Sequence, residues 1–546
     1  MENNVRTVSG NIVDVLNLEI YPGMLKISGS RIVDITREDK TYNTYIIPGL
    51  VDAHVHIESS MLTPSEFARL AVIHGTVATV SDPHEIANVL GIDGVNYMIE
   101  DGRKVPLKFY FGAPSCVPAT EFETAGAKLG LKEIEELLKR DEIKFLSEVM
   151  NYPGVIYQDR EVMAKIELAK KYKTRIDGHA PGIRGEMLEK YVKAGIETDH
   201  ESFEKDEALQ KLELGMKIHI REGSAAKNFN TLSFVIDEHN DMCMLCSDDK
   251  HPDDLVEGQI NELVKRALEL GFDKMKVLRC ASVNPVQHYG LDVGLLQKGD
   301  FADFVVIDNF EDFNILETYI NGEKVAENGK TLLPRVSSEI VNYFQAQKKE
   351  ISEFQIRKAG EVINIIEAID NQVITGRIQD HPRDINGYAA SDTERDILKI
   401  AVVNRYQNVA PAIGFIKNFG LKKGAIATSV AHDSHNVVTV GVSDQDICKA
   451  VNRVIENRGG LAVVCDDFQE TLALPIAGLM SNEDGFKVAQ AYSNLDRRAK
   501  ELGSKLKAPF MTLSFMALLV IPKLKLSDKG LFDGEKFEFV SLFEEL

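Results

Sequence analysis

The sequence has few cysteines, and the six that it has are scattered along 546 residues. Only Cys243 and Cys246 come close to a metal-binding spacing. A strand would point these two thiols to opposite faces, and no second CxxC is present, so we expect them to pack in a core. Cysteine usage of this kind is typical of a reduced, cytoplasmic protein.

Long apolar runs and excess positive charge are also missing. The longest apolar run, residues 510–521, ends at Pro522 and is too short to span a bilayer. Residues 1–20 hold no basic start followed by an apolar core, so we expect no secretion signal. The 63 basic and 84 acidic residues give a formal net charge of −21, which argues against nucleic acid or a membrane as a partner. A small neutral substrate is compatible with this charge.

The most informative segment present is residues 48–56, PGLVDAHVH, where an apolar strand ends in His54 and His56. An extended backbone places positions i and i+2 on one face. At the mouth of a barrel strand, two such imidazoles form half of a divalent-metal site. A bare HxH is more often a pair of structural histidines, but this segment resembles the first-strand signature of the amidohydrolase superfamily.

Further metal-binding side chains follow short apolar runs downstream, at residues 143–147, 175–178, 196–199 and 242–247. They are Glu148, His179, His200 and Asp248. The chain between His54 and Asp248 averages about 28 residues per βα unit over seven steps, near the spacing of a (β/α)8 barrel.

Other apolar runs and segments with helical periodicity lie between and after these predicted strands. The remaining strands are predicted at residues 77–80, 108–111 and 217–220. Helical periodicity is found at residues 64–73, 160–171, 186–194 and 255–270. Alternating short strands and helices favour a parallel barrel.

We therefore predict an α/β protein with a (β/α)8 TIM barrel, a small composite β-sandwich domain and an additional C-terminal α/β domain. The 44% of hydrophobic residues suffice for such cores. Strand-like segments after the barrel, 299–307 and 319–325, resemble amidohydrolase strands that pair with N-terminal ones. The predicted boundaries are 1–47 and 285–336 for the sandwich, 48–284 for the barrel and 337–546 for the C-terminal domain.

Secondary structure is also predicted for the C-terminal domain. Residues 337–353 are expected to form a linker or a surface helix. Strands are predicted at residues 425–430, 437–442 and 461–465, and helices at 444–458 and 485–502.

Four histidine nitrogens and two carboxylates suit a pair of borderline to hard divalent ions. We expect two ions per chain, manganese or iron, with zinc as an alternative. In the arrangement that the superfamily resemblance implies, Glu148 bridges one ion held by His54 and His56 and a second held by His179 and His200. Asp248 binds the first ion and faces a bridging water. It can accept a proton from this water and pass it to a leaving group.

Glu148 points to a smaller group within the amidohydrolases, although a lone glutamate after a strand is usually a solvated turn residue. Many amidohydrolases carry a carboxylated lysine at this place, whereas Lys144 lies too early in the strand. Together with segments 56–60, 81–88 and 220–224 and the whole C-terminal region, the chain closely resembles the bacterial and archaeal adenine deaminases. This likeness runs from about residue 5 to near the C-terminus.

The resemblance implies hydrolytic deamination of adenine to hypoxanthine and ammonia in purine salvage, with Asp248 and Glu148 as catalytic groups, in a homodimer or larger oligomer. Candidate purine-binding groups stand at strand ends, where the mouth of the barrel is expected: His84, Glu85, Arg221 and Glu222. A loop salt bridge or a helix cap is the structural alternative for each of them.

Two rival functions are another cyclic amidohydrolase, such as one that opens a hydantoin ring, and an inactive barrel that serves as a scaffold. The glutamate bridge and the long C-terminal region disfavour the first rival. A scaffold would be expected to have lost ligands, and all six are present. The H-x-E of the cytidine deaminases also occurs at His56, but it requires a later P-C-x-x-C, and Cys243 follows Met242.

Residues 431–436, AHDSHN, connect two predicted strands of the C-terminal domain. Such a connection is usually a solvated hairpin turn. His432 and His435 carry more ionisable chemistry than a turn requires. The alternative is that this loop leans over a barrel mouth, in its own chain or a neighbouring one, and helps to enclose the purine or an additional ion.

Overall fold

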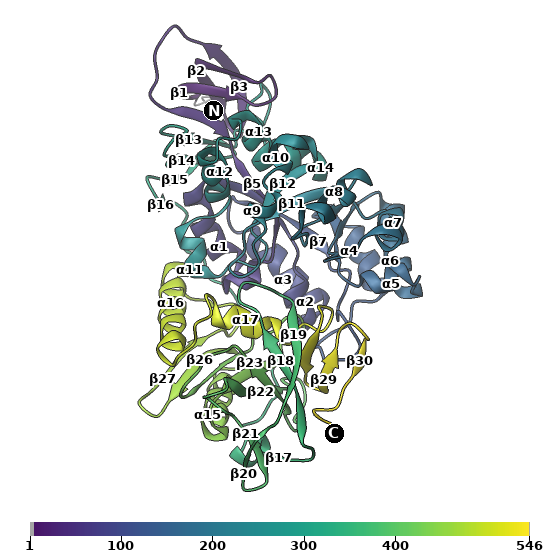
Figure 1. The fold of residues 1–546 in the computed structure, drawn as a ribbon. Helices are drawn as coiled ribbons and strands as arrows, with labels where there is room; N and C mark the ends of the chain where they lie inside the picture. Colours follow the sequence, from purple (N-terminus) through teal and green to yellow (C-terminus); the bar gives the residue numbers. More distant parts are fainter. Residues whose placement is uncertain (1–4, 545–546) are drawn as a thin grey trace.

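A computed structural model of the chain describes residues 5–544 (Figure 1). Eight parallel strands lie in two sheets. The first sheet has the order β5 (Leu50–Val55), β6 (Thr76–Ser81), β7 (Lys108–Ala113), β8 (Ile143–Val149), β9 (Arg175–Gly178). The second has the order β10 (Thr198–Asp199), β11 (Lys217–Arg221), β12 (Cys243–Cys246). The strand predictions in this region are confirmed, although only the last two residues of 196–199 are a strand.

Backbone hydrogen bonds join the two sheets at both of their outer edges. The backbone N–H of Asp248 donates to the carbonyl of His54 at 2.9 Å, beside a parallel bridge between Val55 and Asp248. At the other edge, the N–H of Glu197 donates to Ile176 at 2.9 Å, and Lys217 donates to Glu197 at 2.8 Å. The carboxyl ends of all eight strands therefore lie at one side.

Every residue of β5, β6 and β12 is buried, polar side chains such as Asp52 and His54 included, so burial does not alternate along these strands. Strand β8 extends to Val149 and includes Glu148, which was expected just beyond its end. The strand thus carries the carboxylate on rigid, paired backbone.

Helices cover these strands close to where periodicity predicts them: α1 (Pro64–Ala71), α6 (Arg160–Tyr172) and α7 (Gly185–Lys193). The single helix predicted at 255–270 is wrong. Two helices are present, α11 (Pro252–Glu257) and α12 (Ile260–Glu269), separated at Gly258, whose extended backbone interrupts the helix. Helix α12 buries Ile260, Leu263, Val264 and Ala267, the spacing of an amphipathic face.

Strands from before and after the parallel region share one sheet of eight. Its order is β16 (Lys330–Thr331), β15 (Glu323–Glu327), β14 (Ile315–Ile320), β13, β4, β1 (Arg6–Asp14), β2 (Glu19–Ser28), β3 (Arg31–Arg37). The joining pair is β4 (Tyr45–Pro48) and β13 (Phe304–Ile307), which run antiparallel. The expected pairing of the two segments is confirmed. Hydrogen bonding runs through one continuous sheet, because β4 pairs with both β13 and β1.

The C-terminal region forms a nine-stranded sheet that includes β22 (Ile397–Val403), β24 (Ala425–Thr428), β25 (Val437–Gly441) and β26 (Gly460–Cys465), with helices α15 (Asp444–Glu456) and α16 (Gly485–Glu501). These elements confirm the predictions for this part of the chain. Residues 337–350 form no helix, so the surface-helix alternative is wrong there. Instead, Phe344 is buried among residues of the sheet and of α15, and the buried Lys349 donates from Nζ to Asn408 and to the carbonyl of Val409.

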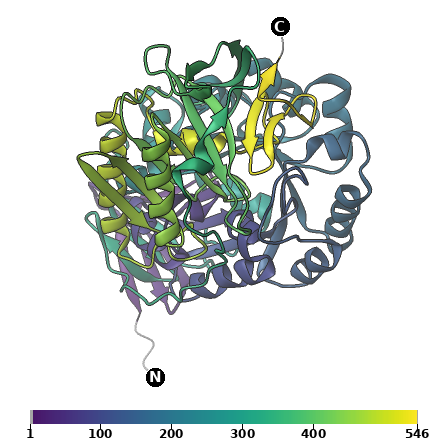
Figure 2. The same ribbon diagram turned by 90° about the horizontal axis from the view of Figure 1, so that it is seen from below.

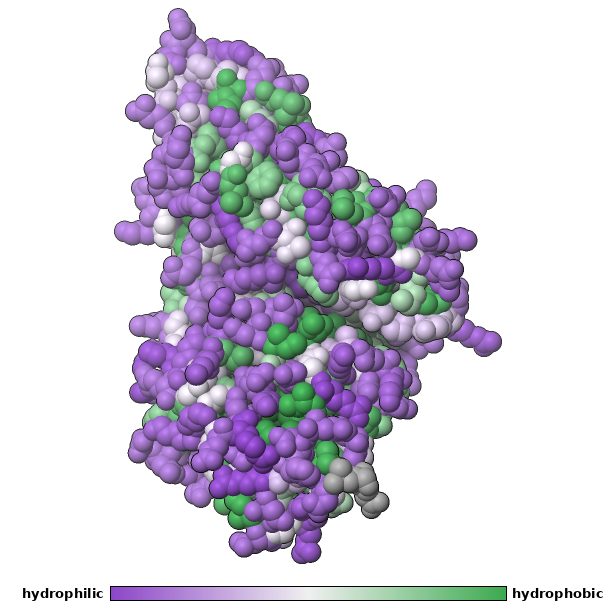
Figure 3. All heavy atoms as spheres, viewed as in Figure 1, coloured by the Kyte–Doolittle hydropathy of each residue, from purple (hydrophilic) through white to green (hydrophobic). Residues whose placement is uncertain are grey.

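Figures 1 and 2 show the C-terminal region lying across one side of the parallel strands, with α17 (Pro509–Phe515) between the two parts. The longest apolar run of the sequence falls in α17 and the residues that follow it, which are buried. The outer face seen in Figure 3 is mostly hydrophilic. Within residues 5–544, no helix has the length and apolar character needed to cross a membrane.

Candidate active site

The structure brings all six predicted metal ligands together at the carboxyl ends of the parallel strands, and each is buried: His54, His56, Glu148, His179, His200 and Asp248. The Nε2 atoms of His54 and His56 are 3.2 Å apart. The Oδ1 atom of Asp248 is 3.2 Å from Nε2 of His56 and 3.7 Å from Nε2 of His54. These three side chains form one half of the cluster.

Glu148 lies between this half and a second pair of histidines. Its Oε1 atom is 3.3 Å from Nε2 of His56. Its Oε2 atom is 2.7 Å from Nδ1 of His179 and 3.1 Å from Nε2 of His200. One carboxylate oxygen therefore faces each half, which is the geometry required of a ligand shared by two ions.

The donor set fits divalent cations. Side chains at the site form several sets of three in which one ligand atom from each residue lies within 4.8 Å of the other two. Three of these sets are His54, His56 and Asp248; His54, Glu148 and His200; and His179, His200 and Glu201. Among the described residues, the buried Nε2 of His179 has no hydrogen-bond partner. A buried polar atom without a partner is costly, and mixed imidazole and carboxylate donors suit zinc, manganese or iron.

Electrostatics keep the carboxylates of this cluster ionised. Burial alone would raise the pKa of Glu148, but His179 and His200 hold that pKa well below its ordinary value. Burial likewise opposes ionisation of Asp248, but the Arg221 guanidinium and His56 keep its pKa well below the usual range. Both groups are therefore charged at neutral pH, as metal ligation requires.

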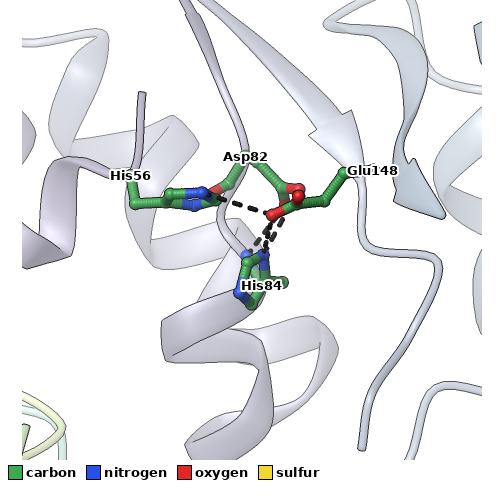
Figure 4. Close-up of side chains that lie close together, drawn as sticks. All are labelled: His56, Asp82, His84 and Glu148. Atoms are coloured by element: carbon green, nitrogen blue, oxygen red, sulfur yellow. Dashed lines mark hydrogen bonds and ion pairs between the residues drawn. The ribbon is translucent and has the colours of Figure 1, made fainter. Parts of the chain in front are cut away.

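His84 begins helix α2 (His84–Leu90) and points at the cluster (Figure 4). Its Nδ1 atom is 3.3 Å from Oδ2 of Asp82 and 3.6 Å from Oε1 of Glu148. The ring thus lies at the edge of the predicted metal site, together with Asp82, for which no role was predicted. A signal for Asp82 existed, because it lies two residues before His84 in a segment already singled out.

Arg221 ends β11 and reaches the cluster, where its Nη1 donates to Oδ2 of Asp248 at 2.6 Å and it also pairs with both oxygens of Glu201. The side chain of Glu222 does not reach the cluster. Its carboxylate lies 3.1 Å from Nη1 of Arg266 and accepts a hydrogen bond from the N–H of Phe229. Successive residues of an extended chain point to opposite sides, so the expected substrate contact of Glu222 is corrected to an outer ion pair.

Glu85 lies where the C-terminal region meets this cluster. Its carboxylate accepts a hydrogen bond from Nδ1 of His432 and is paired with Nε2 of His435. Burial would raise the pKa of Glu85, but the two imidazoles hold it well below its ordinary value, and Glu85 raises the pKa of His432 to about 9 against the effect of burial. An ionised carboxylate is thereby held at the mouth.

The loop at residues 431–436 is buried throughout, each residue being at most 3% exposed. The expectation of a solvated turn is therefore wrong. The alternative placement is confirmed within the same chain, because His432 and Asp433 line the cavity beside the metal-ligand cluster. The apolar wall of this cavity consists of Met150, Val373, Phe515, Leu518, Val520 and Ile521.

Comparisons with known proteins agree with this geometry. Residues 45–325 match the amidohydrolase family, and residues 372–538 match the adenine deaminase C-terminal domain. The chain is 56% identical over 534 residues to an adenine deaminase of Sulfurovum sp. (strain NBC37-1), with 98% of this chain and 99% of that protein covered. The chain belongs to the adenine deaminase family. Adenine deaminases of Salinibacter ruber and Methanosarcina mazei are 53% and 52% identical to it, each with 98% of this chain and 99% of the relative covered.

In this member of the adenine deaminase family, three acidic residues line the cavity although no site role was predicted for them: Glu201, Asp249 and Asp433. Glu201 and Asp249 directly follow the predicted ligands His200 and Asp248, so adjacency was a usable signal. Asp433 lies within the 431–436 loop, for which a place at the barrel mouth was only the alternative prediction.

Proposed function

We propose that the protein hydrolyses adenine to hypoxanthine and ammonia. The observation that carries this proposal is the buried cluster of six nitrogen and oxygen donors beside a cavity, in a chain of the adenine deaminase family. Hydrolysis forms a C6–O bond to water and breaks the C6–N bond, while the departing amine gains a proton. The alternative of opening a cyclic amide is not favoured.

Two divalent ions, manganese or iron, would be held here, one by His54 and His56 with Asp248, the other by His179 and His200, with Glu148 shared. When bound, such ions lower the pKa of water toward neutrality.

Asp248 is the proposed proton carrier, because it is ionised and lies at the cluster. It takes a proton from the attacking water and delivers it to the leaving amine. Arg221 holds Asp248 in place through its 2.6 Å hydrogen bond. His84 and Glu85 face the same cavity and are proposed to hydrogen-bond the ring nitrogens of the purine.

We also propose that the eight parallel strands form one (β/α)8 barrel, with the flanking strands as a composite domain and the residues from 337 onward as a C-terminal domain. Two further proposals keep the expectations from the sequence: a homodimer or larger oligomer, and a cytoplasmic role in purine salvage. All six cysteines are free and buried, which is compatible with a reducing environment.

Substrate choice tests the function. Ammonia release is expected from free adenine and not from adenosine, because the relatives of this chain are named for the base. The assay compares both compounds at equal concentration with the metal-loaded protein. Comparable turnover of adenosine would refute a base-specific site.

The pairs between Glu85 and the 431–436 loop give a second test. The double change His432→Ala and His435→Ala removes two of the three imidazoles that hold the pKa of Glu85 low, so this pKa should rise and the role of Glu85 as an ionised acceptor should be weakened. We expect kcat/KM with adenine to fall by at least about tenfold, with metal content unchanged.

Glu85→Gln removes the same charge without creating space, and it should give a similar kinetic loss. His381→Ala changes an exposed histidine of the same region and serves as the control. If both the double variant and Glu85→Gln match the parent, the loop has no part in the reaction.

A further inference from the structure

Apart from Met150, the apolar wall of the cavity is built from two segments of the C-terminal region that are distant in sequence. Val373 belongs to the first segment. The second segment contributes Phe515, Leu518, Val520 and Ile521. Figure 1 shows α17, which ends at Phe515, between the parallel strands and the C-terminal sheet. These side chains line the same cavity as the metal-ligand cluster, and they offer an apolar surface on which a planar aromatic ring can pack.

Lys525 connects these two segments. It lies on β28 (Leu524–Ser527) and is fully buried. Its Nζ donates to the carbonyl of Val373 at 2.7 Å and to the carbonyl of Phe515 at 2.9 Å. Both acceptors therefore belong to residues that line the cavity.

A buried ammonium without a counter-charge is costly. Burial lowers the pKa of Lys525 to about 7, and no carboxylate among residues 5–544 offsets this shift. The two carbonyls are the interactions that the ammonium makes here, and they connect chain segments that no single element spans.

Neighbouring contacts extend this connection to the polar wall of the cavity. The N–H of Leu526 donates to the carbonyl of Met516 at 3.0 Å, so β28 also holds the start of the segment 516–521. The ring of Phe515 stacks on that of His432, with centroids 5.0 Å apart and planes at 21°. A displacement of Phe515 would therefore reach the histidine that pairs with Glu85.

We propose that Lys525 is a positioning residue for the substrate. It fixes the two apolar segments that close the cavity over adenine, and it does not itself touch the purine. The inference rests on the proposed function, because it takes adenine to be the occupant of the cavity. Loss of the ammonium should loosen the wall that binds the ring in both ground state and transition state, and so raise KM more than it lowers kcat.

Lys399 provides a matched control. It is also a buried lysine of the C-terminal region, 1% exposed, on β22. Its Nζ donates to the carbonyl of Phe354 at 2.9 Å and pairs with Asp444. Neither partner lines the cavity. Lys399→Met should therefore disturb the same region to a comparable degree without moving the wall.

The test compares Lys525→Met with Lys399→Met in the metal-loaded full chain. For Lys525→Met we expect KM for adenine to rise by about tenfold, with kcat within about threefold of the parent. Lys399→Met should leave both constants near those of the parent. Lys525→Gln keeps one amide donor and should fall between the parent and the Met variant. An unchanged KM in folded Lys525→Met protein, or an equal rise in both Met variants, would overturn the proposal.

Amide hydrogen exchange across residues 511–522 gives a readout that does not depend on activity. It should be faster in Lys525→Met and unchanged in Lys399→Met. If the parent does not deaminate adenine, the proposed function fails, and exchange still tests whether Lys525 holds the wall. Exchange in this segment that matches the parent in folded Lys525→Met would overturn the positioning role.

Discussion

Replacing Glu148 by Gln is expected to strip metal from the protein and with it adenine deamination. The neutral amide offers a single oxygen, so it cannot face both halves of the cluster as the carboxylate does. The affinity for metal should fall by at least about 100-fold, the upper end of what the loss of an outer partner costs. Metal content after dialysis and turnover of adenine measure the two effects.

Glu222→Gln is the control for that experiment. It also stands at the end of a parallel strand, but its carboxylate pairs with Arg266 outside the cluster. This variant should keep parent-like metal and activity. Full metal and full activity in Glu148→Gln would show that Glu148 is not shared between two ions, and loss of metal in Glu222→Gln would overturn our correction of its position.

Asp248→Asn is expected to lower kcat by at least about 10²-fold, because the amide cannot accept the proton that leaves water. The replacement suits the backbone. Asp248 has φ 55, in the left-handed region that asparagine tolerates well. Loss of structure is therefore not the expected cause of the defect, and thermal unfolding should confirm this.

A substitution of the neighbouring Asp249 tests which of the two aspartates carries the proton. Its carboxylate accepts a hydrogen bond from Oγ of Ser59 and lies 3.9 Å from Nε2 of His432. Asp249→Asn keeps an acceptor for Ser59 and should retain most of the turnover. An inactive Asp249→Asn beside a nearly normal Asp248→Asn would move the proton carrier one residue along the chain.

The features that could be predicted are those that depend on a short stretch of sequence. Apolar runs ending in a polar ligand mark strands whose ends must meet at one side of a parallel sheet, so His54, His179 and Asp248 could be placed together before the fold was known. Helix predictions succeeded for the same reason. They failed at Gly258, where the extended backbone of one residue divides an otherwise continuous periodic pattern.

What could not be predicted depends on direction and on distant contacts. Arg221 and Glu222 look alike in sequence, and only the phase of the strand decides which one faces inward. The 431–436 loop is buried because it packs on Glu85, 347 residues away from His432. Lys525 looks like a solvated lysine until its two carbonyl partners are located in separate segments.

The central claim is that a two-ion cluster in this chain converts adenine to hypoxanthine. It is tested most directly by removing metal from the full-length protein, titrating it with manganese, iron or zinc, and following hypoxanthine and ammonia at each step. The account predicts no product from the metal-free protein and a rise to a plateau at about two ions per chain with at least one of these metals. Full activity without metal, or no hypoxanthine at any occupancy with any of the three metals, would contradict it.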